Sequence, residues 1–205
     1  MAMVTAGARH PATARALAMD VAAWDQQGCL SPHGAFVEGS FPEVAEFGAW
    51  VAAGLARLET ELPRGPLPAA EAARLRNFRA EYEARSLAGD PVWLAASRAS
   101  LAWTVVVEGG IGFRPSVLNR TVLLWPLARL EEMTERLWPW RAQLQGAGLA
   151  AEPGRAGEME RHVRAAGFPW SAPLGTLQAP PLRWPNKGRD LIQDILTPPS
   201  GEGDA

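Results

Sequence analysis

After residue 40, apolar side chains recur every three or four positions, the spacing of one face of an α-helix. They are Val44, Phe47, Val51, Leu55, Leu58 and Leu62. Ser40 and Glu43 precede this run with the spacing of a capping box, in which two side chains satisfy the first free N–H groups of a helix. The pattern therefore predicts a helix over residues 41–62, ended by the Pro63-Arg64-Gly65-Pro66 segment.

Four further segments have the length and spacing of helices. They are residues 11–24, 69–87, 130–137 and 157–166. The first has Pro11 in its first turn and places Leu17, Val21 and Trp24 on one stripe. The second carries charged and polar residues over much of its surface, as expected for a helix face in contact with water.

Two stretches, residues 101–107 and 121–127, are β-branched and almost continuously apolar, as in strands covered on both faces. Shorter strands are expected at residues 35–38 and 144–150. Strands that alternate with helices at such short spacings predict an α/β fold, with helices layered around a largely parallel sheet. We expect one domain over residues 1–196, followed by a disordered tail rich in proline and glycine over residues 197–205.

Composition narrows the functional classes. The chain has 205 residues and a net charge of −2, which gives no electrostatic basis for binding nucleic acid. No apolar run reaches the roughly 18 residues that span a bilayer, and no signal peptide is recognisable. One cysteine excludes an intrachain disulfide and suits a reducing, cytoplasmic compartment. His10, His33 and His162 are scattered without ligand spacing, so we expect no metal site.

The single cysteine, Cys29, lies between the predicted helix at 11–24 and the predicted strand at 35–38. A short connection there can present a thiol to a substrate, with backbone N–H groups nearby to hold an oxyanion. A lone cysteine is also common as a small apolar core residue. Spacing alone leaves both interpretations open.

The residues around Cys29 read Asp25-Gln26-Gln27-Gly28-Cys29-Leu30-Ser31-Pro32, followed by Ala35-Phe36-Val37-Glu38. This segment resembles the active-site segment of the LuxC-type acyl-CoA reductases, the fatty-acid reductases of the bioluminescence type in the aldehyde dehydrogenase superfamily. The matching order continues through Phe113-Arg114-Pro115, Asn119–Val122, Leu144–Leu149, Pro173-Leu174-Gly175 and Trp184–Arg189. The resemblance therefore covers about residues 20–196 and implies an aldehyde-dehydrogenase-like catalytic domain.

The resemblance also implies a mechanism. Cys29 would accept an acyl group from a long-chain acyl-CoA or acyl-protein thioester, and hydride from NADPH would then release a fatty aldehyde. The backbone N–H of Cys29 would bind the oxyanion, and His33 is the nearest candidate proton donor or base. The expected positioning residues are Gln26, Gln27, Gly28, Ser31 and Pro32.

The chain also departs from the family. The dinucleotide-binding domain lies mainly before the cysteine in that family, whereas only 28 residues precede Cys29 here, and no glycine-rich strand–turn–helix fingerprint is present. We therefore expect the C-terminal, catalytic-cysteine part of such an enzyme, which would work with an N-terminal half or as a homo-oligomer. The alternative is a non-catalytic scaffold or assembly subunit derived from the same fold.

Three points stay open at the level of sequence. A helix that ended just before Cys29 would disfavour a thiolate, and no Lys or Arg lies within eight residues of it. A hydrolase built on Cys29 and His33, with Asp25 as the orienting acid, is a weaker alternative. The tryptophans are expected to be mainly core residues, although some could line an acyl tunnel or an oligomer contact: Trp138, Trp140, Trp170 and Trp184.

Overall fold

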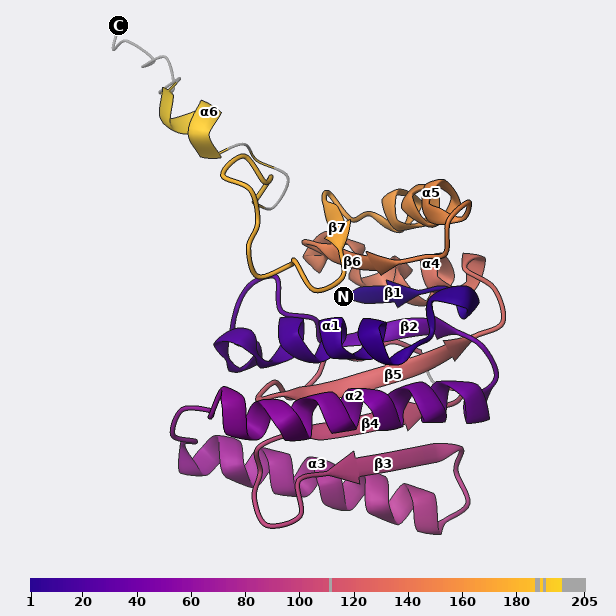
Figure 1. Cartoon of the computed structure of the whole chain (residues 1–205), viewed down its shortest axis with the longest axis vertical. Coiled ribbons are helices and arrows are strands. Elements are labelled where there is room, and N and C mark those ends of the chain that lie inside the picture. Colours follow the sequence, from indigo (N-terminus) through magenta and orange to yellow (C-terminus); the bar gives the residue numbers. More distant parts are fainter. Residues whose placement is uncertain (111, 187–188, 190, 197–205) are drawn as a thin grey trace, which may run out of the picture.

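The computed structural model describes residues 1–110, 112–186, 189 and 191–196. Within them, seven strands form one sheet in the order β3-β4-β5-β2-β1-β6-β7 (Figure 1). The strands are β1 (Ala2–Val4), β2 (Gly34–Glu38), β3 (Val92–Ala96), β4 (Thr104–Glu108), β5 (Thr121–Leu127), β6 (Ala147–Ala150) and β7 (Ser171–Pro173). Only β3 and β4 pair antiparallel among these strands. The predicted largely parallel α/β fold is confirmed.

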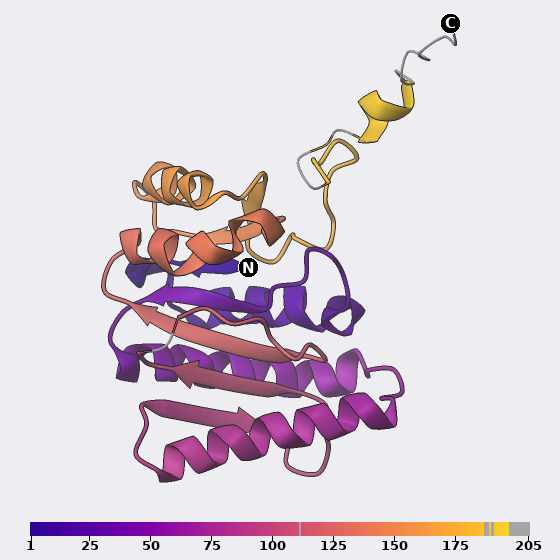
Figure 2. The ribbon, with the colours of Figure 1, turned by 180° about the vertical axis from the view of Figure 1, so that it is seen from behind.

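Helices cover both faces of the sheet. On one face lie α1 (Pro11–Ala22) and α2 (Phe41–Glu61), and on the other lie α3 (Ala69–Leu87), α4 (Glu131–Leu137) and α5 (Ala156–Ala166), as Figures 1 and 2 show from opposite sides. Short 3-10 turns are η1 (Ala6–Ala8), η2 (Ala23–Gln26) and η3 (Trp138–Gln143). Beyond β7 the chain leaves the body and carries α6 (Leu191–Leu196) away from the sheet (Figure 1).

The central strands β4 and β5 are continuously apolar because both of their faces are buried. In β4, Val105 and Val107 pack into the apolar cluster beneath α1 and α2, whereas Val106 packs into the cluster beneath α3, α4 and α5. In β5, Leu124 and Trp125 divide between the two clusters in the same way. Because successive side chains of a strand point to opposite faces, both sets of positions must be apolar when both faces are covered.

The helix starts follow the sequence signals. The carboxylate of Glu43 accepts hydrogen bonds from the Ser40 backbone N–H at 2.8 Å and the Ser40 hydroxyl at 2.7 Å, which confirms the predicted capping box of α2. At the start of α1, His10 Nδ1 accepts a hydrogen bond from the Thr13 N–H at 3.2 Å, and Pro11 occupies the first turn. The two helices that flank the cysteine segment are therefore fixed at their beginnings by local chemistry.

The structure corrects several boundaries. The helix predicted over 11–24 ends at Ala22, and Trp24 adopts a φ of +59° with 70% of its surface exposed, so it does not belong to the buried stripe. The strand predicted at 144–150 is limited to 147–150, and the one at 101–107 occupies 104–108. Strands β1, β3 and β7 were not predicted.

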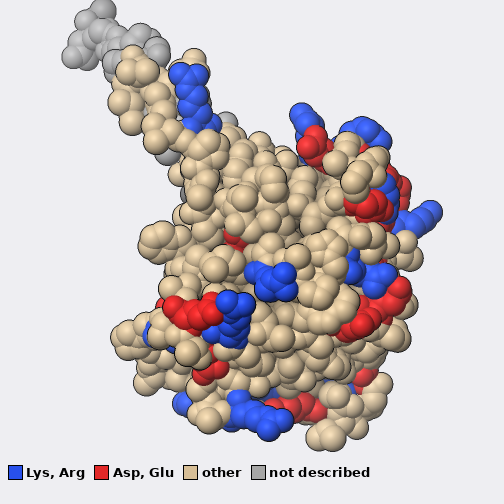
Figure 3. Space-filling model, viewed as in Figure 1, with Lys and Arg blue, Asp and Glu red and all other residues tan. Residues whose placement is uncertain are grey.

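Other predictions concern the C-terminal tail, the tryptophans and the membrane. The tail at 197–205 lies outside the described residues, as do residues 187 and 188 of the resembling Trp184–Arg189 segment. Of the tryptophans, Trp103 and Trp125 are buried, as expected of core residues, whereas Trp138 is 57% exposed. No helix in the described part of the chain is long and apolar enough to cross a membrane. On the face shown in Figure 3, basic and acidic side chains lie beside one another.

Candidate functional site

A pocket lies at the edge of the sheet where its parallel strands begin. Its volume is about 230 Å³. Its lining comes from the segments that lead into β1, β2, β5 and β6, because parallel strands begin at the same edge. The lining residues are Met1, Cys29, Ser31, His33, Phe113, Pro115, Trp140, Gln143, Leu144, Gln145, Gly146 and Phe168. The fold thus places the predicted nucleophile Cys29 and the candidate proton donor His33 in one largely apolar pocket.

Cys29 occupies a tight turn. The Gly28 carbonyl accepts a hydrogen bond from the Ser31 N–H at 2.9 Å, which leaves Cys29 and Leu30 in the middle of the turn. Leu30 is buried and anchors the turn, whereas Cys29 is exposed. Within the described residues, the backbone N–H of Cys29 has no hydrogen-bond partner. The turn therefore offers both a thiol and a free N–H donor on the pocket side of the sheet.

Gln26 fastens this segment to the sheet. Its side-chain Nε2 donates to the Pro32 carbonyl at 2.7 Å and to the Thr121 carbonyl at 2.9 Å. Its Oε1 accepts from the Thr121 N–H at 2.9 Å. The amide therefore bonds to Thr121 as a neighbouring strand would, and Gln26 is 1% exposed. This geometry supports the positioning role expected for Gln26 and extends it to β5, which begins at Thr121.

The other predicted positioning residues differ in their surroundings. Ser31 and Pro32 are buried, whereas Gln27 is exposed. A Cβ at Gly28 would lie 3.1 Å from Ser31 Oγ and 3.1 Å from Gln178 Oε1, so a larger residue would have to displace one of these side chains by a few tenths of an ångström. The Ser31 hydroxyl has no hydrogen-bond partner among the described residues. Gly28 and Pro32 thus shape the turn, and Ser31 places an unused hydroxyl beside the pocket.

His33 is held in one protonation state. Its Nδ1 accepts a hydrogen bond from the Ser116 N–H at 3.1 Å. Burial lowers the pKa of His33 from 6.5 to about 4, so the ring is neutral at pH 7. Since Nδ1 acts as an acceptor, the proton of the neutral ring resides on Nε2. His33 is therefore arranged to donate a hydrogen bond and is poorly suited to take a proton.

Asp25 does not orient His33. Its carboxylate accepts hydrogen bonds from Arg120 Nε at 2.8 Å and from the Gly65 N–H at 3.0 Å. His33 Nδ1 meets a backbone donor, where a triad would require an acid. The Cys–His–Asp hydrolase considered from the sequence therefore lacks its orienting contact.

The sequence objection to an activated Cys29 is partly removed. Helix α1 ends at Ala22, seven residues before Cys29, and the helix dipole acts mainly within the last turn. In the same segment, Arg120 pairs with Asp25 across 95 residues of chain, its Nη2 lying 2.6 Å from Oδ1, so its charge is compensated there. Sequence reasoning missed Arg120 and Ser116 as members of the site because only the fold brings them there. Arg120 lay within the resembling Asn119–Val122 segment, which was the available signal.

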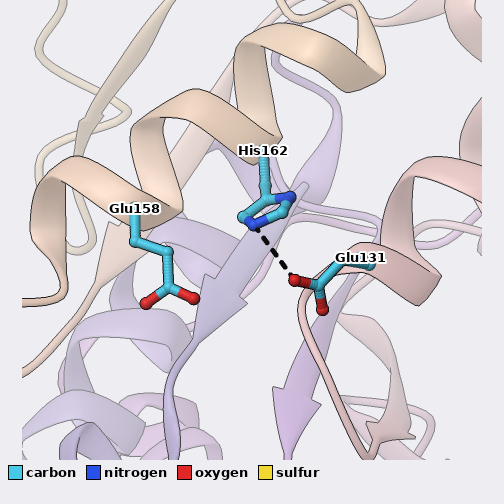
Figure 4. Close-up of side chains that lie close together, drawn as sticks. All are labelled: Glu131, Glu158 and His162. Carbon is cyan, nitrogen blue, oxygen red and sulfur yellow. Dashed lines mark ion pairs between the residues drawn. The ribbon is translucent and has the colours of Figure 1, made fainter.

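A larger hollow, of about 590 Å³, lies at the opposite edge of the sheet, where the parallel strands end. Its charged side chains pair with one another, as Arg9 does with Glu43 at 2.6 Å. Near it, the described residues include three side chains whose ligand atoms lie within 4.8 Å of each other: Glu131, Glu158 and His162 (Figure 4). Arg155 already bonds to the Glu158 carboxylate at 2.7 Å, so this group forms part of an ion-pair network. The predicted nucleophile, Cys29, makes the smaller pocket the candidate site.

The starts of α1 and α2 do not fit the pyrophosphate of a dinucleotide cofactor. Such cofactors place their pyrophosphate at the first turn of a helix that follows a strand. Here the first turn of α2 is occupied by the Glu43 carboxylate, and that of α1 by His10. The two helices that follow β1 and β2 therefore have no free N-terminus for a phosphate group.

Comparisons with known proteins agree with this architecture. Aldehyde dehydrogenase 21 from Physcomitrella patens, solved in complex with the reaction product succinate, superposes with a TM-score of 0.66 at 12% identity, over 90% of this chain and 40% of that one. Succinate-semialdehyde dehydrogenase from Burkholderia pseudomallei superposes with a TM-score of 0.63 at 16% identity, over 92% of this chain and 41% of that one. The chain thus has the aldehyde dehydrogenase fold and spans about two fifths of the length of these enzymes.

At the level of sequence, no curated protein matches the chain. The family described as acyl-CoA reductase (LuxC) matches residues 1–193. This match covers nearly all of the described residues and includes Cys29, its turn and β5. The chain therefore belongs to the LuxC family of acyl-CoA reductases.

Proposed function

We propose that this chain is the catalytic-cysteine part of an acyl-thioester reductase, in which Cys29 accepts the acyl group. The observation that carries the proposal is the turn from Gly28 to Ser31, which leaves the Cys29 thiol exposed and its N–H unpaired at an apolar pocket. A nucleophile, an oxyanion donor and an acyl-binding surface are the requirements of thioester acyl transfer.

In the proposed step, the Cys29 thiolate attacks the carbonyl carbon of the thioester. The carbonyl oxygen becomes an oxyanion, which the Cys29 N–H stabilises, while His33 Nε2–H supplies a hydrogen bond to the oxyanion or to the departing sulfur. Collapse of the tetrahedral intermediate breaks the bond to the carrier thiolate and leaves an acyl-Cys29 thioester. Since Nδ1 already accepts the Ser116 N–H and the pKa of the ring is lowered to about 4, we assign His33 the role of hydrogen-bond donor rather than that of general base.

The pocket favours an acyl chain over a polar substrate. Aromatic and aliphatic side chains from separate segments line it, namely Phe113, Trp140, Leu144 and Phe168. Burying alkyl groups against such a surface is favourable by about 0.8 kcal/mol per methylene group. We therefore propose a long-chain acyl-CoA or acyl-protein thioester as the donor.

Reduction of the acyl-enzyme to an aldehyde requires a nicotinamide cofactor, which the family implies and for which we propose NADPH. Because the starts of α1 and α2 do not fit a pyrophosphate, we propose that another segment or subunit, such as an N-terminal half, holds this cofactor. In the same proposal, residues 1–196 form the cysteine-bearing domain, and the protein is cytoplasmic. The competing function is that of a scaffold or assembly subunit that keeps the fold and does not become acylated.

Intact mass spectrometry after incubation with a long-chain acyl-CoA tests the proposal. The native chain should gain one acyl group, which hydroxylamine removes, and the Cys29→Ser variant should gain none. Leu87→Ala is the control, because its side chain is 90% exposed on α3 and does not line the pocket. Failure of the native chain to be acylated, both alone and with a cofactor-binding half supplied, would favour the scaffold function.

A further inference from the structure

Two segments of the site adopt a left-handed backbone conformation. Residues 24–26 have φ angles of 59°, 51° and 64°, and residues 118–120 have φ angles of 65°, 56° and 59°. Side chains other than glycine disfavour this region because Cβ approaches the following carbonyl oxygen, and runs of three are rarer than single residues. The described chain contains no other positive φ at a non-glycine residue. All six such residues therefore belong to these two turns, 24–26 and 118–120.

The two turns are joined directly. Arg120, at the end of the second turn, donates from Nε to Asp25 Oδ1 at 2.8 Å, and its Nη2 lies 2.6 Å from the same oxygen. Gln26 bonds to both backbone polar groups of Thr121, the residue that follows the second turn. A charged contact and an amide contact thus hold together segments that are 95 residues apart.

Burying the Arg120 guanidinium in this position costs free energy. Arg120 is 2% exposed, and its Nη1 has no hydrogen-bond partner among the described residues. A buried guanidinium group with an unused donor and six residues of left-handed backbone persist only where the surrounding structure over-determines them, and such strain gathers at functional sites. Packing alone does not explain why the buried guanidinium and the left-handed backbone both occur beside the one cysteine.

The first turn continues directly into the cysteine turn. The Gln27 N–H donates to the Trp24 carbonyl at 2.8 Å, and the Ser31 N–H donates to the Gly28 carbonyl at 2.9 Å. Gln26 Nε2 also holds the Pro32 carbonyl, so the segment that carries Cys29 is tied at both of its ends. The position of the thiol relative to the pocket thus depends on the place of residues 24–26.

We propose that Asp25 and Arg120 are positioning residues, which clasp the two left-handed turns together and thereby hold the Cys29 turn in the geometry that acyl transfer requires. The proposal deepens the proposed function and rests on it. Asp25 compensates the charge of Arg120, so the pair acts by placing the loop. A displacement of about 1 Å at a reacting group can lower a rate by about 100-fold.

The test uses the double variant Asp25→Asn/Arg120→Gln, which removes both charges together and so avoids a buried unpaired charge. Hydrogen exchange should rise at least about tenfold at the amides of Gln27 and Ser31, while the amides of α2 keep their protection. Acylation of Cys29 by a long-chain acyl-CoA should fall at least about tenfold. Labelling by iodoacetamide depends on the exposure and thiolate fraction of Cys29 and needs no bound acyl group, so it should stay within about twofold of the native rate.

The matched control is Glu38→Gln/Arg155→Gln, which neutralises an ion pair at the other end of β2, where Arg155 Nη2 lies 2.9 Å from Glu38 Oε1. It should leave both amides and the acylation rate unchanged. Native protection of the Gln27 and Ser31 amides in the test variant would overturn the proposal. If the native chain itself accepts no acyl group, the proposed function fails, and the exchange measurement still decides whether the clasp exists. If the double variant does not fold, the Arg120→Lys variant, which retains the charge, takes its place. Hydrogen exchange, acylation and iodoacetamide labelling are then measured on that variant.

Discussion

Replacing Gln26 with Ala tests the contact that ties the cysteine segment to β5. The change removes three hydrogen bonds of 2.7–2.9 Å and leaves the Thr121 N–H and the Pro32 carbonyl without their partner, whereas the Thr121 carbonyl keeps the Ser116 hydroxyl at 2.6 Å. Each hydrogen bond contributes about 1 kcal/mol, and each buried polar group left unpaired costs about 1–3 kcal/mol. We expect the free energy of unfolding to fall by about 3–5 kcal/mol, measured by urea denaturation at pH 7.

Gln26→Glu tests the same reasoning through pH. An ionised carboxylate would face two carbonyl oxygens, so its pKa should be raised in the folded state above the unfolded value of about 4.3. Below that value the variant should lose about 1 kcal/mol, because a protonated acid replaces only one of the two donated bonds. As the pH rises, the unfolded chain releases its proton first, so stability falls by about 1.4 kcal/mol per unit until the folded pKa is reached.

The neighbouring variant Gln27→Glu is the matched control, because that side chain is exposed and should change stability by less than about 0.5 kcal/mol. Denaturation curves of the native chain and both variants at pH 4 and pH 7 provide the comparison. A Gln26→Glu variant as stable as the native chain at pH 7 would refute the reasoning.

Three further expectations concern the scaffold of the site. Gly34→Ala should lower the free energy of unfolding by about 3 kcal/mol or more, because the added Cβ would lie 2.1 Å from the Leu123 carbonyl oxygen. Gly112→Ala is the control: no atom lies within 4 Å of its Cβ position, so it should be neutral in the same denaturation assay. Burial lowers the pKa of His33 from 6.5 in the unfolded chain to about 4 in the folded chain, so the unfolded chain takes up the proton first as the pH falls. The contribution of His33 to the free energy of unfolding, at most about 3 kcal/mol, should therefore be complete above pH 6.5 and be lost as the pH falls toward 4. His33→Asn should remove that pH dependence, and a native His33 that titrates near 6.5 by NMR would contradict the assignment. Glu108→Ala should cost about 3–5 kcal/mol in thermal unfolding, because this wholly buried carboxylate accepts hydrogen bonds from two side chains.

The sequence predicted those elements whose signals are local. The capping residues Ser40 and Glu43 and the periodicity after them located α2 to within one residue. The apolar run at 121–127 located β5, and the motif around Cys29 pointed to the family that residues 1–193 match. These signals are sufficient because each depends on neighbours along the chain.

Elements that depend on distant partners were not predicted. Strand β1 has only three residues, too few for a periodicity, and it is defined by its pairing with β2 and β6. The left-handed conformation of Trp24 opposes its local preference and is maintained by contacts with the 118–120 turn. The tautomer of His33 follows from Ser116, 83 residues away. Such features require the tertiary structure, since no nearby residue specifies them.

The position of β1 has a consequence for folding kinetics. The sheet consists of two groups of strands, β3-β4-β5-β2 and β6-β7, and β1 joins them through Ala2–Val4 alone. Its partners lie 33 residues away in β2 and 146 residues away in β6, as the pairing of Ala2 with Ala35 and Gly148 shows. Because the loop between β1 and β2 is much the shorter, β1 should pair with β2 before it pairs with β6 during synthesis. Until residues 147–150 have emerged, one edge of β1 is an open template for strand pairing, and aggregation during synthesis should begin there.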